Sequence, residues 1–312
     1  MDEHTPSDLP GQPLPAGMTN QSAPADGCAG SDRRGHRQVP ADWREANRSN
    51  WDERVPIHVA SDFYDVKAFR EGRDFLRDFE VAEVGDVTGR TLLHLQCHFG
   101  QDTLSWARRG AARVVGLDFS APAVAAARAL AADVGLGPDR AAFVAADVYD
   151  APAAVPEPSY DIVYTGTGAL NWLPDVDRWA RTAASLVAPG GFLYLAEFHP
   201  LTDALDDETG SRVVHDYFSR DPWIDDEPLT YTDAGPGTAI TSSRTVEWQH
   251  PIGDVVSALC AAGLRLEFLH EHDTSVFARF DDLVQTGEQR YRFPEGRPRI
   301  PLMYSLKASR PR

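Results

Sequence analysis

The alternation of hydrophobic and polar positions is most regular between residues 91 and 198. Short apolar runs there are separated by segments whose apolar positions recur about every three or four residues. Compact apolar runs between turn residues predict buried strands, and the longer periodicity predicts helices. Because strands that alternate with helices build a parallel sheet covered on both faces, this region predicts a doubly wound, mostly parallel α/β domain.

The predicted elements follow one another in strict alternation. Strands are expected at residues 92–95, 113–117, 142–144, 160–165 and 192–198, and helices at residues 102–109, 121–134 and 176–187. Ser120 supplies an N-cap for the second of these helices, and Gly135 ends it. Farther along, a helix at residues 252–262 precedes strands at residues 264–270 and 301–308. This order suits a sheet whose last strand is antiparallel.

The N-terminal part of the chain divides into two segments. Residues 1–40 are rich in Pro, Gly, Ser and Asp and contain few large apolar side chains. Such a segment buries too little surface to offset its ordering entropy, so we expect a disordered tail. Residues 41–85 contain spaced aromatic and apolar positions, which predict a helical cover with breaks near Pro56 and Gly72.

The main domain is expected over residues 86–312, with one interruption. Residues at about 201–248 are polar, acidic and aromatic and lose the regular alternation. Strand-like pieces at residues 213–218 and 240–248 indicate a β-rich cap inserted into the domain.

Composition narrows the class of function. A net charge of −17 on 312 residues disfavours a phosphate-binding surface, so nucleic acid is not expected as a partner. No apolar run reaches the roughly eighteen residues of a membrane span. The cysteines Cys28, Cys97 and Cys260 lack metal-ligand spacing, so neither a metal site nor a disulfide is predicted. We expect a cytoplasmic protein with a small-molecule substrate, and leave its oligomeric state open, a homodimer included.

The most informative motif is a strand and loop that end at Gly100, followed by a second strand that ends at Asp118. This arrangement binds nucleotide-like ligands, because loop N–H groups and the helix N-terminus face the ligand while the carboxylate accepts ribose hydroxyls. A dinucleotide fold wants three glycines in that loop, and this loop has only Gly100. Asp118 has an alternative role as a helix-capping aspartate, although Ser120 already fills the cap position.

The motif series resembles that of class I S-adenosylmethionine-dependent methyltransferases. The resemblance extends over roughly residues 85–200 and is carried by Leu92-Leu93-His94-Leu95-Gln96-Cys97-His98-Phe99-Gly100, Val115-Gly116-Leu117-Asp118-Phe119-Ser120, Ala145-Ala146-Asp147-Val148, Tyr160-Asp161-Ile162-Val163 and Leu186-Val187-Ala188-Pro189-Gly190-Gly191. It is closest to a bacterial subfamily that methylates small molecules. It implies a seven-stranded Rossmann-like sheet of order 3-2-1-4-5-7-6, with S-adenosyl-L-methionine as cofactor and S-adenosyl-L-homocysteine as product.

The resemblance also implies roles for individual residues. Asp118 would bind the ribose, and Asp147 would bind the adenine amine, with Val148 offering a backbone N–H; Asp147 has an alternative role in a turn. The cofactor-binding candidates are Gln96, Cys97, His98, Gly100, Asp118, Phe119, Asp147, Val148 and Thr165.

The first loop departs from the family pattern. His94 replaces the family acid and is expected to be a hydrogen-bonded core histidine. Gln96 and His98 replace two glycines, and would either contact the methionine half of the cofactor or fill space.

The catalytic candidates follow the fourth and fifth strands. His199 is a candidate general base at the carboxyl edge of the sheet, with a turn-fixing role beside Pro200 as the alternative. The resemblance implies that Asn171 would open the helix beneath the reactive sulfonium. Glu197 is a candidate for orienting a substrate amine.

The substrate pocket is expected to have aromatic walls. Its candidates are Trp51, Tyr64, Trp172, Tyr217 and Trp223, with Tyr231 nearby in the cap and plain core packing as the alternative. Arg54 and His58 share a helical face with Trp51. That face would be either a lid reaching the cofactor carboxylate or a helix that simply lies on the domain.

Two functions remain open from the sequence. The first is methyl transfer to oxygen, nitrogen or carbon of a small molecule by in-line displacement. The second keeps the fold and the cofactor but catalyses a different reaction, such as a cyclisation. A nicotinamide dehydrogenase is disfavoured by the missing glycines.

Overall fold

The structure is a computed structural model that describes residues 39–232 and 240–312. The predicted tail over residues 1–40 therefore lies almost wholly outside the described residues. The helices are α1 (Trp43–Ala60), α2 (Val66–Arg70), α3 (Asp78–Val84), α4 (Gln101–Arg108), α5 (Ala121–Asp133), α6 (Ala151–Ala154), α7 (Val176–Leu186) and α8 (Ile252–Ala261). The strands are β1 (Thr91–Leu95), β2 (Arg113–Asp118), β3 (Ala141–Ala145), β4 (Tyr160–Thr165), β5 (Val187–Phe198), β6 (Trp223–Asp225), β7 (Thr245–Glu247), β8 (Arg265–His272), β9 (Val284–Gly287), β10 (Arg290–Arg292) and β11 (Met303–Ser309).

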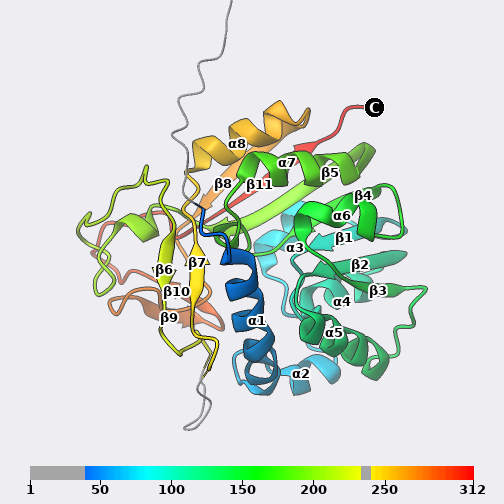
Figure 1. Ribbon diagram of the computed structural model, residues 1–312, viewed down its shortest axis with the longest axis horizontal. Coiled ribbons are helices and arrows are strands. Elements are labelled where there is room, and N and C mark those ends of the chain that lie inside the picture. The colour runs from blue at the N-terminus through cyan, green and yellow to red at the C-terminus, as the bar shows by residue number, and fades with distance from the viewer. Residues whose placement is uncertain (1–38, 233–239) are drawn as a thin grey trace, which may run out of the picture. The chain divides into compact units, whose positions relative to one another are not determined.

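Seven strands form the central sheet in the order β3-β2-β1-β4-β5-β11-β8 (Figure 1). Strands β1 to β5 are parallel, and β11 is antiparallel to both β5 and β8. This confirms the predicted order 3-2-1-4-5-7-6 with an antiparallel last strand. Leu95 pairs with Leu117 and with Thr165, so the loops after β1, β2 and β4 leave the sheet side by side.

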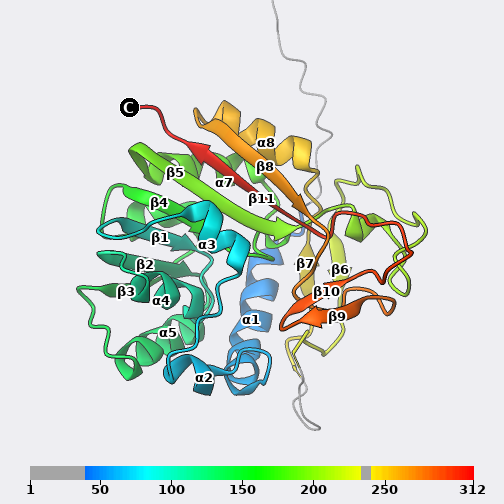
Figure 2. The ribbon, with the colours of Figure 1, turned by 180° about the vertical axis from the view of Figure 1, so that it is seen from behind.

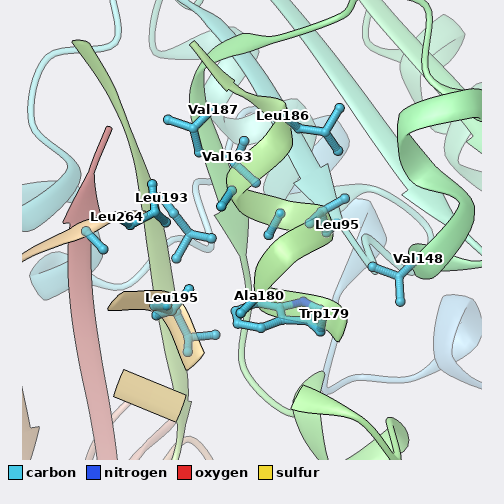
Figure 3. Packing of buried hydrophobic residues seen from close by; sticks show 14 of the residues in the cluster. Leu95, Val148, Val163, Trp179, Ala180, Leu186, Val187, Leu193, Leu195 and Leu264 are labelled. Carbon is cyan, nitrogen blue, oxygen red and sulfur yellow. The ribbon is translucent and has the colours of Figure 1, made fainter. Parts of the chain in front are cut away.

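Helices cover both faces of the sheet. Trp179 and Ala180 of α7 belong to the same buried cluster as Leu95, Val163 and Leu193 of the strands (Figure 3). Helix α8 adds to this face, while α3, α4 and α5 pack on the opposite one, as the view from behind shows (Figure 2). Apolar strands buried on both faces explain why their sequences read as continuous hydrophobic runs.

The main differences from the predicted bounds have local causes. Strand β5 begins at Val187 rather than at residue 192, because Gly190 and Gly191 exchange backbone hydrogen bonds with Arg310 and so extend the pairing. As predicted, Ser120 caps α5 by accepting the amide of Ala123.

Helix α1 does not break at Pro56, which corrects the expectation from the sequence. A proline removes one helical donor, and tertiary contacts hold this helix regardless. Asn47 exchanges two hydrogen bonds with the backbone of Val246, and Asn50 donates to the carbonyl of Ser242. The expected break near Gly72 is present, since α2 ends at Arg70.

Glu53 completes the attachment of α1 to the cap. Its carboxylate accepts hydrogen bonds from the backbone amides and the hydroxyls of Thr241 and Ser242. Together with Asn47 and Asn50, this residue fixes one face of α1 against β7 and the segment that precedes it. Figure 1 shows α1 between the central sheet and the pair of strands β6 and β7.

The cap is less regular than its sequence suggested. Its strands β6 and β7 form a two-stranded antiparallel sheet, and β7 lies within the predicted stretch 240–248. The predicted strand at residues 213–218 is wrong, because that segment makes only a single bridge at Val213 and leaves Val213 and Phe218 exposed. The β9–β10 hairpin was not predicted. Within the described part of the chain, no helix has the length and apolarity to cross a membrane.

Replacing Glu53 by Gln tests the attachment of α1 to the cap. The donors of Thr241 and Ser242 lower the pKa of Glu53 from its usual 4.5 to about 2. Because this pKa is depressed, the stabilisation is present above pH 4.5 and is lost as the pH falls toward 2. We expect Glu53→Gln to speed amide hydrogen exchange at Thr241 and Ser242 roughly tenfold at pH 7. Glu45→Gln, on the exposed part of α1, should leave these amides unchanged; equal exchange rates in native protein and Glu53→Gln would contradict the attachment.

Candidate active site

The first loop keeps the backbone shape of a glycine loop with other side chains. Gln96 has φ 58°, His98 has φ 49° and Gly100 has φ 78°, all in the left-handed region. All three residues stand where the family pattern has glycines, and a left-handed backbone costs each of the two non-glycine residues about 1–2 kcal/mol. Gly100 cannot be replaced in this way, because a Cβ there would lie 2.5 Å from Cε1 of Phe143.

Asp118 joins this loop to the end of β2. Its Oδ2 accepts the amide N–H of His98 at 2.8 Å, and its Oδ1 accepts the amide N–H of Ser120 at 2.9 Å. The side chain is buried, and burial raises the pKa of its carboxyl to about 6. Each oxygen has a further lone pair, so the carboxylate is fixed in orientation and can still accept hydrogen bonds.

The other candidates in the first loop have different surroundings. Cys97 is buried, its thiol packs against the position of Gly116, and its amide donates to the carbonyl of Leu117. Only its backbone therefore belongs to the loop surface. Gln96 donates from Nε2 to the carbonyl of Ala169, which ties the loop to the segment after β4. His94 is the hydrogen-bonded buried histidine expected, with Nδ1 2.8 Å from Oγ1 of Thr103.

Candidates for the adenine side lie beyond β2 and β3. Asp147 accepts the amide of Tyr149 and pairs with Nε of Arg44 at 2.8 Å. These contacts support the turn role of Asp147 and leave its adenine role a prediction. Val148 is buried in the core, and Phe119, next to Asp118, is partly exposed.

Glu197 fixes the loop that follows β4. Its carboxylate accepts the amides of Gly168, Ala169 and Leu170, and also that of Phe198. With both oxygens engaged in this way, Glu197 supports the loop rather than a substrate amine, contrary to the sequence-based interpretation.

His199 has a partner at each ring nitrogen. Its Nδ1 accepts the amide of Leu201 at 3.1 Å, and its Nε2 lies 3.0 Å from Oε1 of Glu271. An imidazole that accepts at Nδ1 carries its proton at Nε2 and donates it to Glu271. The geometry thus favours the turn-fixing role of His199 over proton abstraction, and its catalytic role stays a prediction.

Asn171 contacts a carboxylate that sequence reasoning missed. Its Nδ2 donates to Oε2 of Glu247 at 2.7 Å, and its backbone carbonyl accepts the amide of Trp248. Burial raises the pKa of Glu247, and the charged groups that also act on this carboxyl are Arg54, Asp203 and Asp225. In the sequence, Glu247 stood out only as an acidic residue within the strand-like piece at residues 240–248 of the predicted cap.

Aromatic side chains from α1, the first loop and the segment after β4 form one cluster. Trp51 contacts the rings of His98 at 5.1 Å and Trp172 at 5.3 Å, while Tyr64 contacts His98 and Tyr231. This cluster brings together three of the five predicted wall residues. The other two predicted wall residues have different contacts. Trp223 is 57% exposed and its ring packs against that of His215. The hydroxyl of Tyr217 accepts the amide of Ile252.

Two neutral histidines join α1 to the first loop. Nδ1 of His58 lies 2.9 Å from Nε2 of His98, and Nε2 of His58 lies 2.6 Å from Oγ1 of Thr230. Burial and the cation of Arg54 lower the pKa of His58 to about 3, and burial also lowers that of His98. One ring therefore donates to the other as a neutral pair.

Several buried polar atoms around these loops have no hydrogen-bond partner among the described residues. They are Oδ1 of Asp52, Nε of Arg54, Oε1 of Gln96, Oγ1 of Thr165, Oγ1 of Thr167 and Oδ1 of Asn171. Buried polar groups in native proteins are rarely left unpaired, so their gathering at this edge fits a polar ligand. The donors and acceptors suit the hydroxyls and the zwitterionic end of S-adenosylmethionine. A hollow of about 840 Å³ lies elsewhere, between residues 73–79 and the β9–β10 hairpin. No group of three or more potential metal ligands is found among the described residues.

Substitutions of His98 test the left-handed backbone of the first loop. Alanine and glycine both remove the ring, but only glycine adopts φ 49° without strain. We expect His98→Gly to be more stable than His98→Ala by about 1 kcal/mol in urea unfolding. The order should reverse within α5, where Ala125→Gly should cost about 1 kcal/mol. A more stable His98→Ala would contradict the loop conformation.

Comparisons with known proteins agree with this geometry. Residues 92–191 match the family model of a methyltransferase domain. No curated protein matches the sequence. A solved S-adenosylmethionine-dependent methyltransferase from Mesorhizobium loti is 22% identical, with 77% of this chain and 100% of that chain covered and a TM-score of 0.50. A proposed S-adenosylmethionine-dependent methyltransferase from Listeria monocytogenes is 17% identical, with 75% and 98% covered and a TM-score of 0.51.

At these identities the two solved structures speak for the fold, and the family match covers the segment that contains Gly100, Asp118 and Asp147. Together with the seven-stranded sheet, they show that residues 92–191 match a methyltransferase domain and that the chain has the Rossmann-like fold of the S-adenosylmethionine-dependent methyltransferases.

Proposed function

We propose that this protein transfers the methyl group of S-adenosylmethionine to oxygen, nitrogen or carbon of a small-molecule acceptor. The observation that carries the proposal is the left-handed first loop joined to Asp118 at the carboxyl edge of the sheet. Ligands of open α/β sheets bind at this edge. The matched methyltransferase domain contains both parts of the arrangement.

The residues of this edge suit the cofactor. Asp118, oriented by the amides of His98 and Ser120, keeps lone pairs for the two ribose hydroxyls. Phe119 and Val148 lie at the ends of the next strands, where the adenine is expected. Gly100 allows α4 to begin close to the ligand, with its N-terminal amides directed toward it.

A small acceptor suits the surroundings of the site. Helix α1 packs against β7, and Trp51 and Tyr64 contact His98 of the first loop, while Trp51 also contacts Trp172 of the segment after β4. Aromatic walls favour planar or cationic molecules. The net charge of −17 opposes a polyanionic acceptor such as nucleic acid.

For methyl transfer, the protein has to align the acceptor atom with the methyl group and, where the acceptor carries a proton, accept that proton. When bound, S-adenosylmethionine supplies an electrophilic methyl group for in-line displacement. Glu197 holds the segment after β4 and so positions Asn171 and Trp172. Glu247, held by Asn171, is the carboxylate we assign to accept a proton from an acceptor hydroxyl or ammonium.

Calorimetry with S-adenosylhomocysteine tests the cofactor assignment. We expect S-adenosylhomocysteine to bind more tightly than NAD, and Asp118→Ala to weaken its binding by about 1–3 kcal/mol because the ribose loses its acceptor. Asp139→Ala, which removes an exposed carboxylate on the loop before β3, is the matched control and should leave the affinity unchanged. Tighter binding of NAD would overturn the proposal, and an unchanged affinity of Asp118→Ala would overturn the ribose role.

Methyl transfer itself is tested with S-adenosylmethionine carrying an isotopic label in its methyl group. The protein is incubated with the small-molecule fraction of a bacterial extract, and mass spectrometry follows S-adenosylhomocysteine and labelled products. Formation of both supports transfer. If S-adenosylhomocysteine binds but the label never leaves the cofactor across a broad set of extracts, transfer is wrong and the non-transfer alternative is favoured.

Glu247→Gln tests the proton acceptor once that assay has identified a labelled product. The amide keeps the hydrogen bonding of the side chain but cannot take a proton, so we expect kcat to fall roughly 100-fold or more for an acceptor that loses a proton. S-adenosylhomocysteine affinity should stay within about twofold. His199→Asn is the comparison variant and should lower kcat far less; the reverse order would return the base role to His199.

A further inference from the structure

The end of β1 lacks the acid that the family pattern places there. Its position is taken by His94, whose Nδ1 is bonded to Thr103. Burial, with a smaller effect from Arg77, lowers the pKa of His94 to about 3, so the ring is neutral at physiological pH. This strand end therefore supplies no negative charge to a cationic ligand group.

A carboxylate from a different element faces the same place. Asp102 is the second residue of α4 and follows by four positions His98, whose amide binds Asp118. A Cβ built on Gly166 would lie 3.4 Å from Nε2 of His94 and 3.8 Å from Oδ2 of Asp102. Both side chains thus face the glycine that opens the segment after β4.

Asp102 has no partner within the described chain. The structure shows it no hydrogen bond and no ion pair, although the carboxyl is largely withdrawn from solvent. Burial raises its pKa to about 7, and Arg77, Glu80 and Asp74 are the charged groups that act on it. Arg77 is paired with Glu80, and Asp74 with Arg109, so no cation is committed to Asp102.

The opposite charge is carried by Arg54, on which the carboxylates of Glu247 and Asp225 act without forming an ion pair. Arg54 of α1 is 8% exposed, makes no ion pair with the described residues, and leaves its Nε without a hydrogen bond. Its guanidinium lies 5.1 Å from the ring of Trp51 and 5.5 Å from that of Trp172. A buried charge is costly unless it is paired, so both Arg54 and Asp102 are set up for a ligand.

Tyr64 lies within reach of both charges. The Asp102 carboxylate raises the pKa of the Tyr64 phenol and the Arg54 guanidinium lowers it, in addition to the larger effect of burial. Tyr64 is held by Tyr231 and by Gln101, the neighbour of Asp102 in α4. An unpaired anion and an unpaired cation thus flank one tyrosine beside the first loop. An α-amino acid end carries one ammonium and one carboxylate, the two charges that would pair with these residues.

We propose that Asp102 binds the α-ammonium and Arg54 the α-carboxylate of an amino acid end, that of the cofactor's methionine half. This inference rests on the proposed function and deepens it. We assign this amino acid end to the cofactor because the first loop leads directly into α4, where Asp102 lies, and is bonded through His98 to Asp118, the residue assigned to the ribose. Asp102 then takes over, from the first turn of α4, the charge that His94 does not provide.

Calorimetry with two related ligands tests the assignment on the full-length protein. S-adenosylhomocysteine has the amino acid end, and 5′-methylthioadenosine keeps the adenosine and the sulfur without it. We expect Asp102→Asn and Arg54→Gln each to weaken S-adenosylhomocysteine binding roughly tenfold or more. Both variants should bind 5′-methylthioadenosine like the native protein. Asp74→Asn, which removes a carboxylate that is already paired, is the matched control and should change neither affinity.

Decarboxylated S-adenosylhomocysteine separates the two contacts, because it retains the ammonium alone. Asp102→Asn should weaken this ligand as much as it weakens S-adenosylhomocysteine, whereas Arg54→Gln should leave it unchanged. Thermal unfolding without ligand checks that each variant is folded. Asp102→Asn should be at least as stable as the native protein, since it removes a buried unpaired charge.

The outcomes separate this inference from the proposed function. Equal losses for S-adenosylhomocysteine and 5′-methylthioadenosine, or no loss for either, would overturn the inference and leave the cofactor assignment standing. Native protein that binds neither ligand would overturn the proposed function. A free amino acid acceptor is the other ligand that could bind Asp102 and Arg54. A mixture of common amino acids is therefore titrated into the protein at saturating S-adenosylhomocysteine. If an amino acid binds and Asp102→Asn abolishes that binding, Asp102 and Arg54 belong to the acceptor site and the inference is overturned.

Discussion

The hydrogen bond from the amide of His98 to Asp118 is the contact on which the site depends. It joins the first loop, which must be left-handed at three positions, to the end of β2, which the parallel register fixes beside β1. A loop of this shape without its glycines is strained, so it needs an acceptor to hold it. The same bond orients the Asp118 carboxylate. Loop geometry and ligand recognition therefore share one residue.

Helix α1 carries two sets of side chains with different contacts. Asn47, Asn50 and Glu53 bind the cap through backbone and hydroxyl groups. Trp51, Arg54 and His58 point instead toward the first loop and the segment after β4. Because one rigid helix carries both sets, the position of the cap and the chemistry above the loop are coupled. This gives a structural role to a segment that lies outside the matched methyltransferase domain.

Pairing explains why some predicted site residues have other roles. Glu197 and His199 are the right residue types at the right edge of the sheet, yet the first is saturated by backbone amides and the second has partners at both nitrogens. Glu247 and Asp102 were not predicted from the sequence. Unlike Glu197 and His199, they can still accept hydrogen bonds or a proton from a ligand. Residue type and strand position predict which side chains reach an edge, whereas hydrogen-bond saturation decides which of them can act.

The sequence by itself determined the sheet, because short buried strands, capped helices and glycine stops are local signals that the tertiary structure had no reason to override. It also located Gly100, Asp118 and the loop between them. It could not foresee that α1 continues through Pro56, since long-range hydrogen bonds to the cap hold that helix. Nor could it pair Asn171 with Glu247, or set Arg54 and Asp102 around Tyr64. Those contacts join segments far apart in the chain, and only the folded backbone brings their side chains together at the edge where Gln96 and His98 adopt the shape of the missing glycines.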